Sequence, residues 1–512
     1  MLQDGKIFIG ASRKKDDSIN KGEYLDLKFG NRHGLITGAT GTGKTVTLQV
    51  LAEGFSNAGV PVFCADIKGD LSGIGAMGDH KDFLDKRAQD IGLDPYDTQE
   101  FPAIYWDIYG EKGHRVRTTL TEMGPLLLSR LMNASDAQEG CLNIAFKIAD
   151  EGKMPLLDIK DLQALLNYMG ENAQQLSNQF GFITKASIGT IQRELLILEQ
   201  QGAEKFFGEP GLQVKDIMRV TNDGRGAISV LAADKLMMNP RLYGTFLLWL
   251  LSELFEDLPE VGDIDKPKLV FFFDEAHLLF KDAPPALLER IEQVVRLIRS
   301  KGVGVYFITQ NPMDIPPTVL AQLGNRIQHA LRAYTPNEQK AVKTAADTFR
   351  PNPDFDCATA ITQLGTGEAL VSTLEAKGIP SMVERTLIRP PASRVGPILD
   401  DERNAVLASS PVAGLYDEDF DRESAYEILA AKAQAAEDVQ AAAQAPSEAP
   451  AEPTSRWTLP GFGTSPAEPA ARPRAGYQRE SVGEAVVKSV ARAVASQVGR
   501  ALVRGILGSL RR

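Results

Sequence analysis

One eight-residue stretch near the N-terminus narrows the possible folds of this chain more than any other. Residues 38–45 read GATGTGKT, with the spacing G-x-x-x-x-G-K-[ST]. The apolar run 34–37 precedes the stretch, and the helix-like run 46–51 follows it. A strand, a glycine-rich turn and a helix start in this order form a phosphate-binding loop. Its glycines let backbone N–H groups converge on an anion, and the helix N-terminus adds partial positive charge. The stretch therefore predicts an α/β fold with a nucleotide on this loop.

The residues of this loop have separate expected roles. The Lys44 ammonium can reach the β- and γ-phosphates of ATP, and the Thr45 hydroxyl can ligate Mg²⁺. ATP and Mg²⁺ are thus the predicted cofactors. The predicted ATP-binding residues are Gly38, Ala39, Thr40, Gly41, Thr42, Gly43, Lys44 and Thr45.

A second motif, LVFFFDEAH, occupies residues 269–277. Its five leading apolar residues are typical of a strand buried on both faces of a parallel sheet. Asp274 and Glu275 follow at the end of the strand, where open α/β sheets bind their ligands. We expect Asp274 to hold Mg²⁺ and Glu275 to activate the attacking water as a general base. The alternative is that these carboxylates only cap the next helix. His277 is either structural or a sensor of nucleotide or substrate.

Two further strand ends carry polar residues. The run 302–310, GVGVYFITQ, ends in Gln310. We expect Gln310 to hydrogen-bond the γ-phosphate and the attacking water, although a strand-end amide can also bond the next turn. The run 60–67 leads into the charged tip Asp66–Asp70, which is expected either to contact nucleotide or substrate or to be a solvated strand end.

The composition is that of an ordinary soluble protein, with 43% hydrophobic and 24% charged residues. Its three cysteines are scattered and lack metal-ligand spacing. They favour the reducing cytoplasm and argue against a disulfide framework or a zinc site. The longest apolar stretch, 242–255, contains Glu253 and is too short to span a bilayer. The net charge of −11 speaks against a simple nucleic-acid binder, but a ring can hold a basic pore inside an acidic exterior.

The alternation of strands and helices predicts a doubly wound, mostly parallel sheet. We assign residues 1–118 and 223–400 to two parts of one ATPase core. Helical periodicity in residues 119–222 predicts an all-α insertion between them. Residues 401–476, Ala- and Pro-rich toward their end, predict a flexible linker. Residues 477–512 predict a basic amphipathic helix, because an apolar residue recurs at every fourth position with arginines between.

Three targets are open for this last helix. From residue 480 to residue 512, six Lys and Arg stand against two Glu, a net charge of +4. The helix would dock on its own ring or a protein partner, lie on an anionic membrane surface, or bind nucleic acid. The expected location is therefore the cytoplasm, either free or peripheral to the inner membrane.

The chain resembles the HerA–FtsK group of phosphate-loop ATPases, and within it the bacterial HerA-helicase-like proteins, over about residues 20–390. The resemblance implies a RecA-like core, homo-oligomeric rings, usually hexamers, and ATP-driven translocation along double-stranded DNA. The stretches that carry it are GATGTGKT (38–45), FFFDEAH (271–277), GVGVYFITQNP (302–312), LGNRIQHALRAYTP (323–336) and LGTGEALVS (364–372).

The resemblance also implies an arginine finger that enters the site of a neighbouring subunit. Arg326 is the first candidate and Arg332 the second, although an arginine here can instead pair with a nearby carboxylate.

Only 37 residues precede Gly38, too few for the N-terminal β-barrel of HerA helicases. Three functions are therefore weighed: a motor acting on DNA, a motor acting on protein or at the membrane, and a nucleotide-dependent scaffold.

Overall fold

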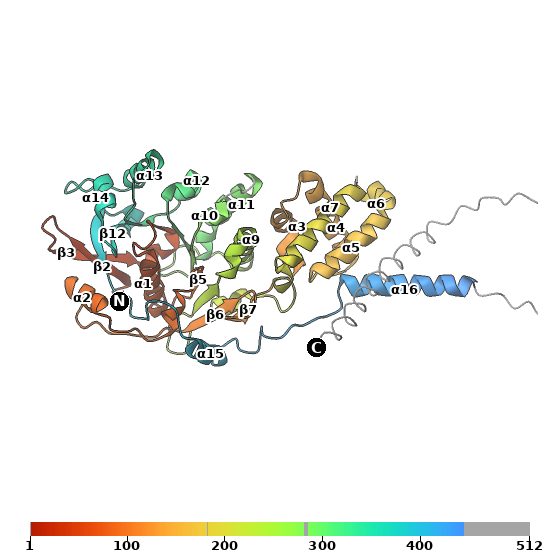
Figure 1. Cartoon of the computed structure of the whole chain (residues 1–512), viewed down its shortest axis with the longest axis horizontal. Coiled ribbons are helices and arrows are strands. Elements are labelled where there is room, and N and C mark those ends of the chain that lie inside the picture. The colour runs from red at the N-terminus through yellow and green to blue at the C-terminus, as the bar shows by residue number, and fades with distance from the viewer. Residues whose placement is uncertain (1, 182, 281–284, 445–512) are drawn as a thin grey trace, which may run out of the picture. The chain divides into compact units, whose positions relative to one another are not determined.

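The computed structural model describes residues 2–181, 183–280 and 285–444 (Figure 1). The chain divides into two compact units. Of the described residues, those within 2–135 and 196–421 form the first unit, and those within 136–195 and 422–444 form the second.

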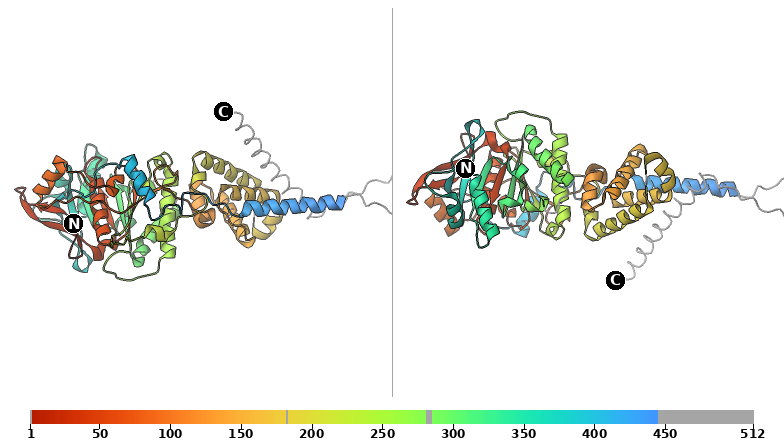
Figure 2. Two further views of the ribbon diagram at one scale, coloured as in Figure 1. Left: turned by 90° about the horizontal axis from the view of Figure 1, so that it is seen from below. Right: turned by 90° about the horizontal axis from the view of Figure 1, so that it is seen from above.

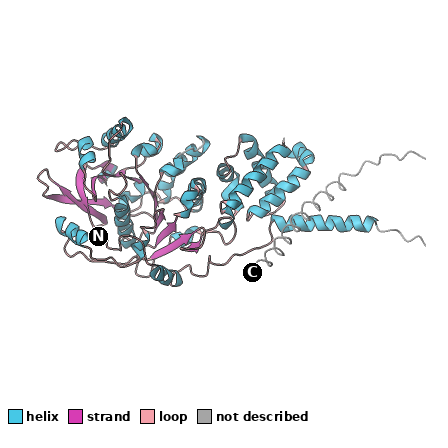
Figure 3. Cartoon of the chain, in the orientation of Figure 1, coloured by secondary structure: helices cyan, strands magenta, loops and turns pink. Residues whose placement is uncertain are grey.

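The first unit is built on one large sheet, whose strands are magenta in Figure 3. Its central part is entirely parallel, in the order β11-β4-β10-β9-β5-β8-β6-β7. The predicted doubly wound, mostly parallel fold is confirmed. The strands are β4 (Gly34–Thr37), β5 (Val62–Asp66), β6 (Ala103–Asp107), β7 (His114–Arg115), β8 (Ile228–Ala232), β9 (Leu269–Phe273), β10 (Val303–Thr309) and β11 (Asn325–His329).

An antiparallel extension continues the sheet beyond β11. It begins with β12, which pairs antiparallel with β11, and ends with the N-terminal strands of the chain. A small separate hairpin, β13 with β14, lies between β12 and β15 in the sequence. These strands are β12 (Glu368–Ser372), β13 (Leu374–Glu375), β14 (Ile379–Pro380), β15 (Glu384–Ile388), β2 (Lys6–Arg13), β3 (Ile19–Asp26) and β1 (Leu2–Gln3).

The central strands are buried on both faces, because helices lie on either side of the sheet (Figure 2). Alternate residues of one strand point to opposite faces. On one face, Phe272 and Tyr306 pack against Phe55 of α1 (Lys44–Asn57). On the other face, the ring centroids of Phe273 and Phe307 lie 5.6 Å apart. The run 269–273 therefore has the two-sided burial that its composition predicts.

The helices of the first unit connect these strands. The apolar run 242–255 lies in α9, which begins where the Asn239 side chain accepts from the Leu242 N–H. Within residues 2–181, 183–280 and 285–444, no helix combines the length and the hydropathy that a membrane span requires. The helices are α1 (Lys44–Asn57), α2 (Asp82–Asp90), α3 (Leu120–Leu131), α8 (Val214–Ile217), α9 (Pro240–Asp257), α10 (His277–Phe280), α11 (Pro285–Leu297), α12 (Pro317–Leu320), α13 (Pro336–Asp347), α14 (Cys357–Gln363) and α15 (Asp400–Ala408).

The described part of the second unit is helical. It contains the core of the expected all-α insertion. This segment of the unit runs from residue 136 to residue 195, whereas the expected insertion ran from residue 119 to residue 222. Its helices are α4 (Asp136–Glu151), α5 (Ile159–Glu171), α6 (Ala173–Phe180), α7 (Lys185–Gln200), which crosses the boundary at residue 195, and α16 (Ala425–Gln444).

The expected linker from residue 401 is wrong where α15 and α16 lie. Alanine is the strongest helix former, and Ala425, Leu429 and Ala433 are buried at a helical spacing of four. The buried Asp161 carboxylate of α5 also accepts from the Tyr426 N–H at 2.8 Å, which fixes the start of α16. The rest of the predicted linker and the predicted helix 477–512 lie outside the described residues.

Candidate nucleotide-binding site

The loop between β4 and α1 has the backbone geometry of a phosphate cradle. Gly38 and Gly43 have φ angles of 153° and 114°, which side chains rarely adopt. A Cβ on Gly38 would lie 2.5 Å from the His329 Cβ, and one on Gly43 would lie 3.1 Å from the Gly367 Cα. Gly43 is also the N-cap of α1, so the loop leads directly into a helix N-terminus. Both glycines are required by close approach as well as by conformation.

Lys44 folds back over this loop. Its ammonium donates to the carbonyl oxygens of Gly38 at 2.6 Å and Ala39 at 3.0 Å, and its side chain is buried. Burial lowers the pKa of Lys44, as does the charge of Lys68, while Glu275 and Asp274 act in the opposite direction. A cation is thus already held where the phosphates of a nucleotide would lie.

Asp274 follows directly on β9, the strand next to β10. The Tyr243 hydroxyl donates to its carbonyl oxygen at 2.9 Å, and the Glu275 N–H donates to its Oδ1 at 2.9 Å. Burial and the neighbouring Glu275 charge raise the pKa of Asp274 to about 6. A partly buried carboxylate close to several charges suits Mg²⁺, which is usually held by one or two protein oxygens together with phosphates. Asp274, with Thr45 at the start of α1, fits that requirement.

Glu275 lies at the centre of a small polar cluster. Gln310 Nε2 lies 3.3 Å from Glu275 Oε1, and His277 Nδ1 lies 3.4 Å from Oε2. Thr40 of the loop in turn donates to Gln310 Oε1 at 3.4 Å. The structure therefore brings the loop, Glu275 and Gln310 together.

The backbone at Glu275 is strained. Its φ angle is 47°, in the left-handed region that a residue with a side chain adopts at a cost of about 1–3 kcal/mol. Such strain is concentrated at functional sites, where it aims a side chain that regular structure would not. Here it accompanies a buried carboxylate beside the phosphate-binding loop.

The charged tip after β5 contains two residues with different roles. The Asp66 carboxylate accepts from the N–H groups of Gly69 at 2.8 Å and Leu71 at 3.1 Å, so it shapes the turn. Burial and the nearby Asp70 raise the pKa of Asp66 to about 7. Lys68 instead reaches the site, with Nζ 3.7 Å from Glu275 Oε1. The charge at the end of this predicted strand was a signal for a contact here, but the pattern did not distinguish Lys68 from its neighbours.

His329, a residue without a predicted role, lies behind the loop and supports it. Its Nδ1 donates to the Glu368 carbonyl oxygen at 2.9 Å, which leaves Nε2 to accept from the Thr47 hydroxyl at 2.8 Å. Burial lowers the pKa of His329 to about 4, so the ring is neutral near pH 7. The residue connects α1, β11 and β12 at the back of the phosphate-binding loop.

The two arginine candidates have different surroundings. The Arg326 guanidinium donates to the carbonyl oxygens of Leu323 at 3.1 Å, Leu320 at 3.0 Å and Thr348 at 3.3 Å. The partners of Arg326 are therefore backbone carbonyl oxygens of its own chain. This arrangement is neither the free guanidinium expected of a finger nor the carboxylate pair expected as the alternative. Arg332 lies beyond β11 and is exposed.

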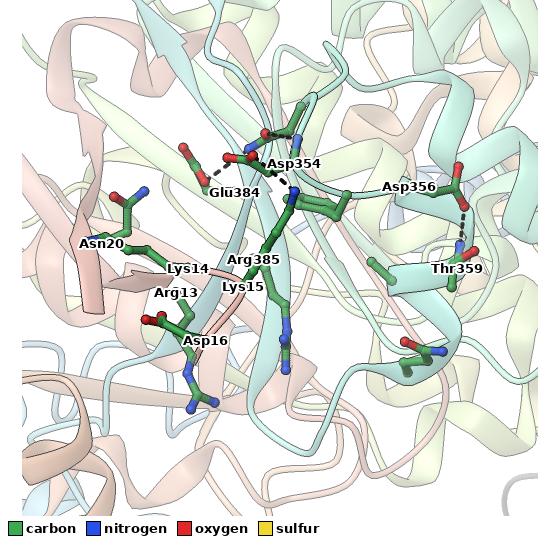
Figure 4. Close-up of a pocket in the computed structure, with 14 residues that line it drawn as sticks. Arg13, Lys14, Lys15, Asp16, Asn20, Asp354, Asp356, Thr359, Glu384 and Arg385 are labelled. Carbon is green, nitrogen blue, oxygen red and sulfur yellow. Dashed lines mark hydrogen bonds and ion pairs between the residues drawn. The ribbon is translucent and has the colours of Figure 1, made fainter. Parts of the chain in front are cut away.

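A separate cavity of about 840 Å³ lies between the β2–β3 hairpin and the segment 352–363 (Figure 4). Charged residues of both signs line it, and they contact one another: Lys15 Nζ lies 3.4 Å from Asp354 Oδ1. Asp356 accepts from the Thr359 N–H at 2.7 Å and so caps α14. None of the predicted site residues lines this cavity.

The chain matches one family model and is similar in sequence to known helicases. The model of the family described as helicase HerA-like C-terminal matches residues 11–512. The probable helicase MJECL08 of Methanocaldococcus jannaschii is 32% identical over 138 residues, which is 25% of this chain and 25% of that protein. The DNA double-strand break repair helicase HerA of Sulfolobus acidocaldarius is 31% identical over 99 residues, 19% of each chain. The chain thus spans a quarter or less of the length of these relatives.

A solved structure shows the same fold over a longer stretch. VirB4 of Thermoanaerobacter pseudethanolicus superposes with a TM-score of 0.50 at 14% identity, over 78% of this chain and 99% of that one. The first unit has the RecA-like architecture of phosphate-loop ATPases, as the resemblance implied. With a family model matched along nearly its whole length and the family's motifs gathered in one site, the chain belongs to the helicase HerA-like C-terminal family.

Proposed function

We propose that this protein binds ATP and hydrolyses it as an oligomeric motor. The observation that carries the proposal is the convergence of Lys44, Glu275 and Gln310 at the carboxyl ends of three parallel strands that are neighbours in the sheet, β4, β10 and β9. Phosphate-loop enzymes need a cation at the phosphates, a base for water and a sensor of the γ-phosphate, and these side chains supply them.

Each step falls to a named group. The loop N–H groups and Lys44 hold the phosphates, and Lys44 exchanges its bonds to the Gly38 and Ala39 carbonyl oxygens for phosphate oxygens. Thr45 and Asp274 would hold Mg²⁺, which supplies charge neutralisation at the phosphates when bound. Glu275 orients the attacking water and accepts its proton, while Gln310 links Glu275 to the loop through Thr40.

The ring and its arginine finger are further parts of this proposal. An arginine from the neighbouring subunit would stabilise the charge that develops on the γ-phosphate. Of the two candidates, the exposed Arg332 is favoured, because Arg326 already donates to three carbonyl oxygens of its own chain.

We propose double-stranded DNA as the substrate of the motor. The support is that both sequence relatives are named as helicases, one of them for repair of DNA double-strand breaks. The test is steady-state ATP hydrolysis with and without long linear duplex DNA, at low salt and at high salt. We expect the turnover rate to rise with DNA, and the rise to fade at high salt because phosphate contacts are weakened by screening. A rate that duplex DNA leaves unchanged at low salt would contradict a DNA motor and favour a protein or membrane substrate.

A further inference from the structure

Lys68 is a charged residue at the site that this mechanism does not use. It follows β5, the strand next to β9, and its Nζ lies 3.7 Å from Glu275 Oε1. The Lys68 side chain is 43% exposed and that of Glu275 is 6% exposed. A mobile cation therefore reaches from solvent to the buried carboxylate that serves as the proposed base.

The turn that carries Lys68 is fixed by its own hydrogen bonds. Both oxygens of Asp66 accept backbone N–H groups of the turn, from Gly69 and Leu71, and the Ser72 hydroxyl donates to the Gly69 carbonyl oxygen at 2.7 Å. Gly69 has a φ angle of 78°, which allows the chain to reverse directly after Lys68. The root of the Lys68 side chain is thus held in place, and only its long stem remains free to move.

The pair between Lys68 and Glu275 is weak in this arrangement. A separation of 3.7 Å qualifies as an ion pair but exceeds the 2.7–2.9 Å typical of a charge-assisted hydrogen bond. Glu275 also keeps two other contacts, with Gln310 and His277, that would still orient it without Lys68. A more highly charged anion nearby would therefore attract the Lys68 ammonium away.

We propose that Lys68 exchanges Glu275 for the γ-phosphate when ATP binds, and returns to Glu275 when only ADP is present. This inference rests on the proposed function as an ATPase. The γ-phosphate offers more negative charge and more acceptor oxygens than one carboxylate. The exchange releases Glu275 to hold the attacking water only while a γ-phosphate is present. Lys68 is thereby a positioning residue that couples the state of the nucleotide to the state of the base.

The first test compares equilibrium binding of ADP and of a non-hydrolysable ATP analogue. We expect Lys68→Met to weaken binding of the analogue roughly tenfold, the loss of one charge-assisted contact, and to change ADP binding less than about twofold. Lys68→Arg keeps the charge and should restore most of the preference for the analogue. The matched control is Lys112→Met, because Lys112 is also 43% exposed and pairs with Asp234 at 2.7 Å outside the site. It should bind both nucleotides as the unmodified protein does.

The second test detects the exchange itself through a double-mutant cycle with Glu275→Gln. If Lys68 leaves Glu275 when the analogue binds, part of the binding free energy from its contact with the γ-phosphate is offset by the loss of the ion pair with Glu275. Lys68→Met should then weaken analogue binding more in the Glu275→Gln background than in the unmodified protein. If Lys68 stays on Glu275 throughout, its effect should shrink or vanish in that background, which would overturn the proposal. Equal losses for ADP and the analogue would overturn it as well.

These outcomes are separable from failure of the proposed function. A protein that binds neither nucleotide, or one whose binding Lys44→Ala leaves unchanged, would contradict the ATPase assignment. A protein that binds ATP through Lys44 but is indifferent to Lys68→Met would contradict the exchange alone.

Discussion

His329 is the residue that fixes the phosphate-binding loop from behind. Its ring is fully buried and joins the Thr47 hydroxyl to the Glu368 carbonyl oxygen. Around the same loop, the Ala39 N–H donates to Ala330 and the Gly367 N–H donates to Thr42. These single contacts set the geometry in which Lys44 and Glu275 can act together, so their loss should affect both stability and nucleotide binding.

His329→Leu tests this role. It leaves a buried hydroxyl and a buried carbonyl oxygen without their partner, at about 1–3 kcal/mol for each group. We expect the free energy of unfolding to fall by about 3 kcal/mol and ATP binding to weaken, measured by urea denaturation and nucleotide titration. His80→Leu is the control, because His80 is exposed and its contacts, an ion pair with Asp85 and an edge-to-face contact with Tyr96, lie away from the phosphate-binding loop. An equal loss in both variants would contradict the structural role of His329.

The protonation of the same residue predicts a pH dependence. The pKa of His329 is about 4 in the folded protein and near 6.5 when unfolded, so the unfolded state binds more protons between these values. The stability that the neutral ring contributes is full above pH 6.5 and is lost as pH falls toward 4. At pH 5 the loss should be about 2 kcal/mol relative to pH 7.

Other buried groups also titrate in this pH range. The test therefore compares the pH dependence of the unfolding free energy in the unmodified protein with that in His329→Leu. The fall in unfolding free energy from pH 7 to pH 5 should be about 2 kcal/mol larger in the unmodified protein than in His329→Leu. Identical slopes in the two proteins would show that His329 is not protonated differently in the folded and unfolded states.

At the scale of elements, the sequence predicted a helix or strand well where a single local feature, such as an unbroken apolar run or a glycine-rich turn, determined it. The run 269–273 is apolar throughout and could be assigned as a buried strand, and residues 38–45 located a loop and a helix start. The pattern failed for α16, because the Ala-, Pro-, Glu- and Gln-rich composition of this region pointed to a linker. Asp161, more than 260 residues away in sequence, provides the contact that orders the helix. The hydrogen bonds of Arg326 and the ion pair of Lys68 could not be predicted from the sequence for the same reason, because they reach partners on other elements.

Asp161→Ala tests whether α16 depends on this contact. The carboxylate accepts from the N–H groups of Leu157 and Tyr426, both at 2.8 Å, and from the Ser424 hydroxyl. Its loss should expose the first turns of α16, seen as faster amide hydrogen exchange over about residues 424–435. Asp438→Ala removes an exposed carboxylate of the same helix and should leave that exchange unchanged. Exchange that stays slow in Asp161→Ala would show that apolar contacts alone order the helix.

At the scale of the whole molecule, the proposed ring predicts that one site is shared between two subunits. Lys44→Ala damages the nucleotide side of a site, and Arg332→Ala removes the finger offered to the next one. Mixing the two inactive proteins should restore part of the ATP hydrolysis, because some interfaces then combine two intact halves. The same mixture made with Arg326→Ala distinguishes the two arginines. A co-assembled mixture that stays as inactive as its parents would contradict a finger acting between subunits.

The central claim is that Glu275 activates water for hydrolysis of ATP held by Lys44. Single-turnover cleavage of bound ATP, measured by rapid quench, tests it most directly. Glu275→Gln should bind ATP about as tightly as the unmodified protein but cleave it slower by roughly 10²–10⁴-fold, the usual contribution of a general base. Lys44→Ala should instead lose binding, which separates the two roles. Cleavage by Glu275→Gln at the unmodified rate would contradict the account.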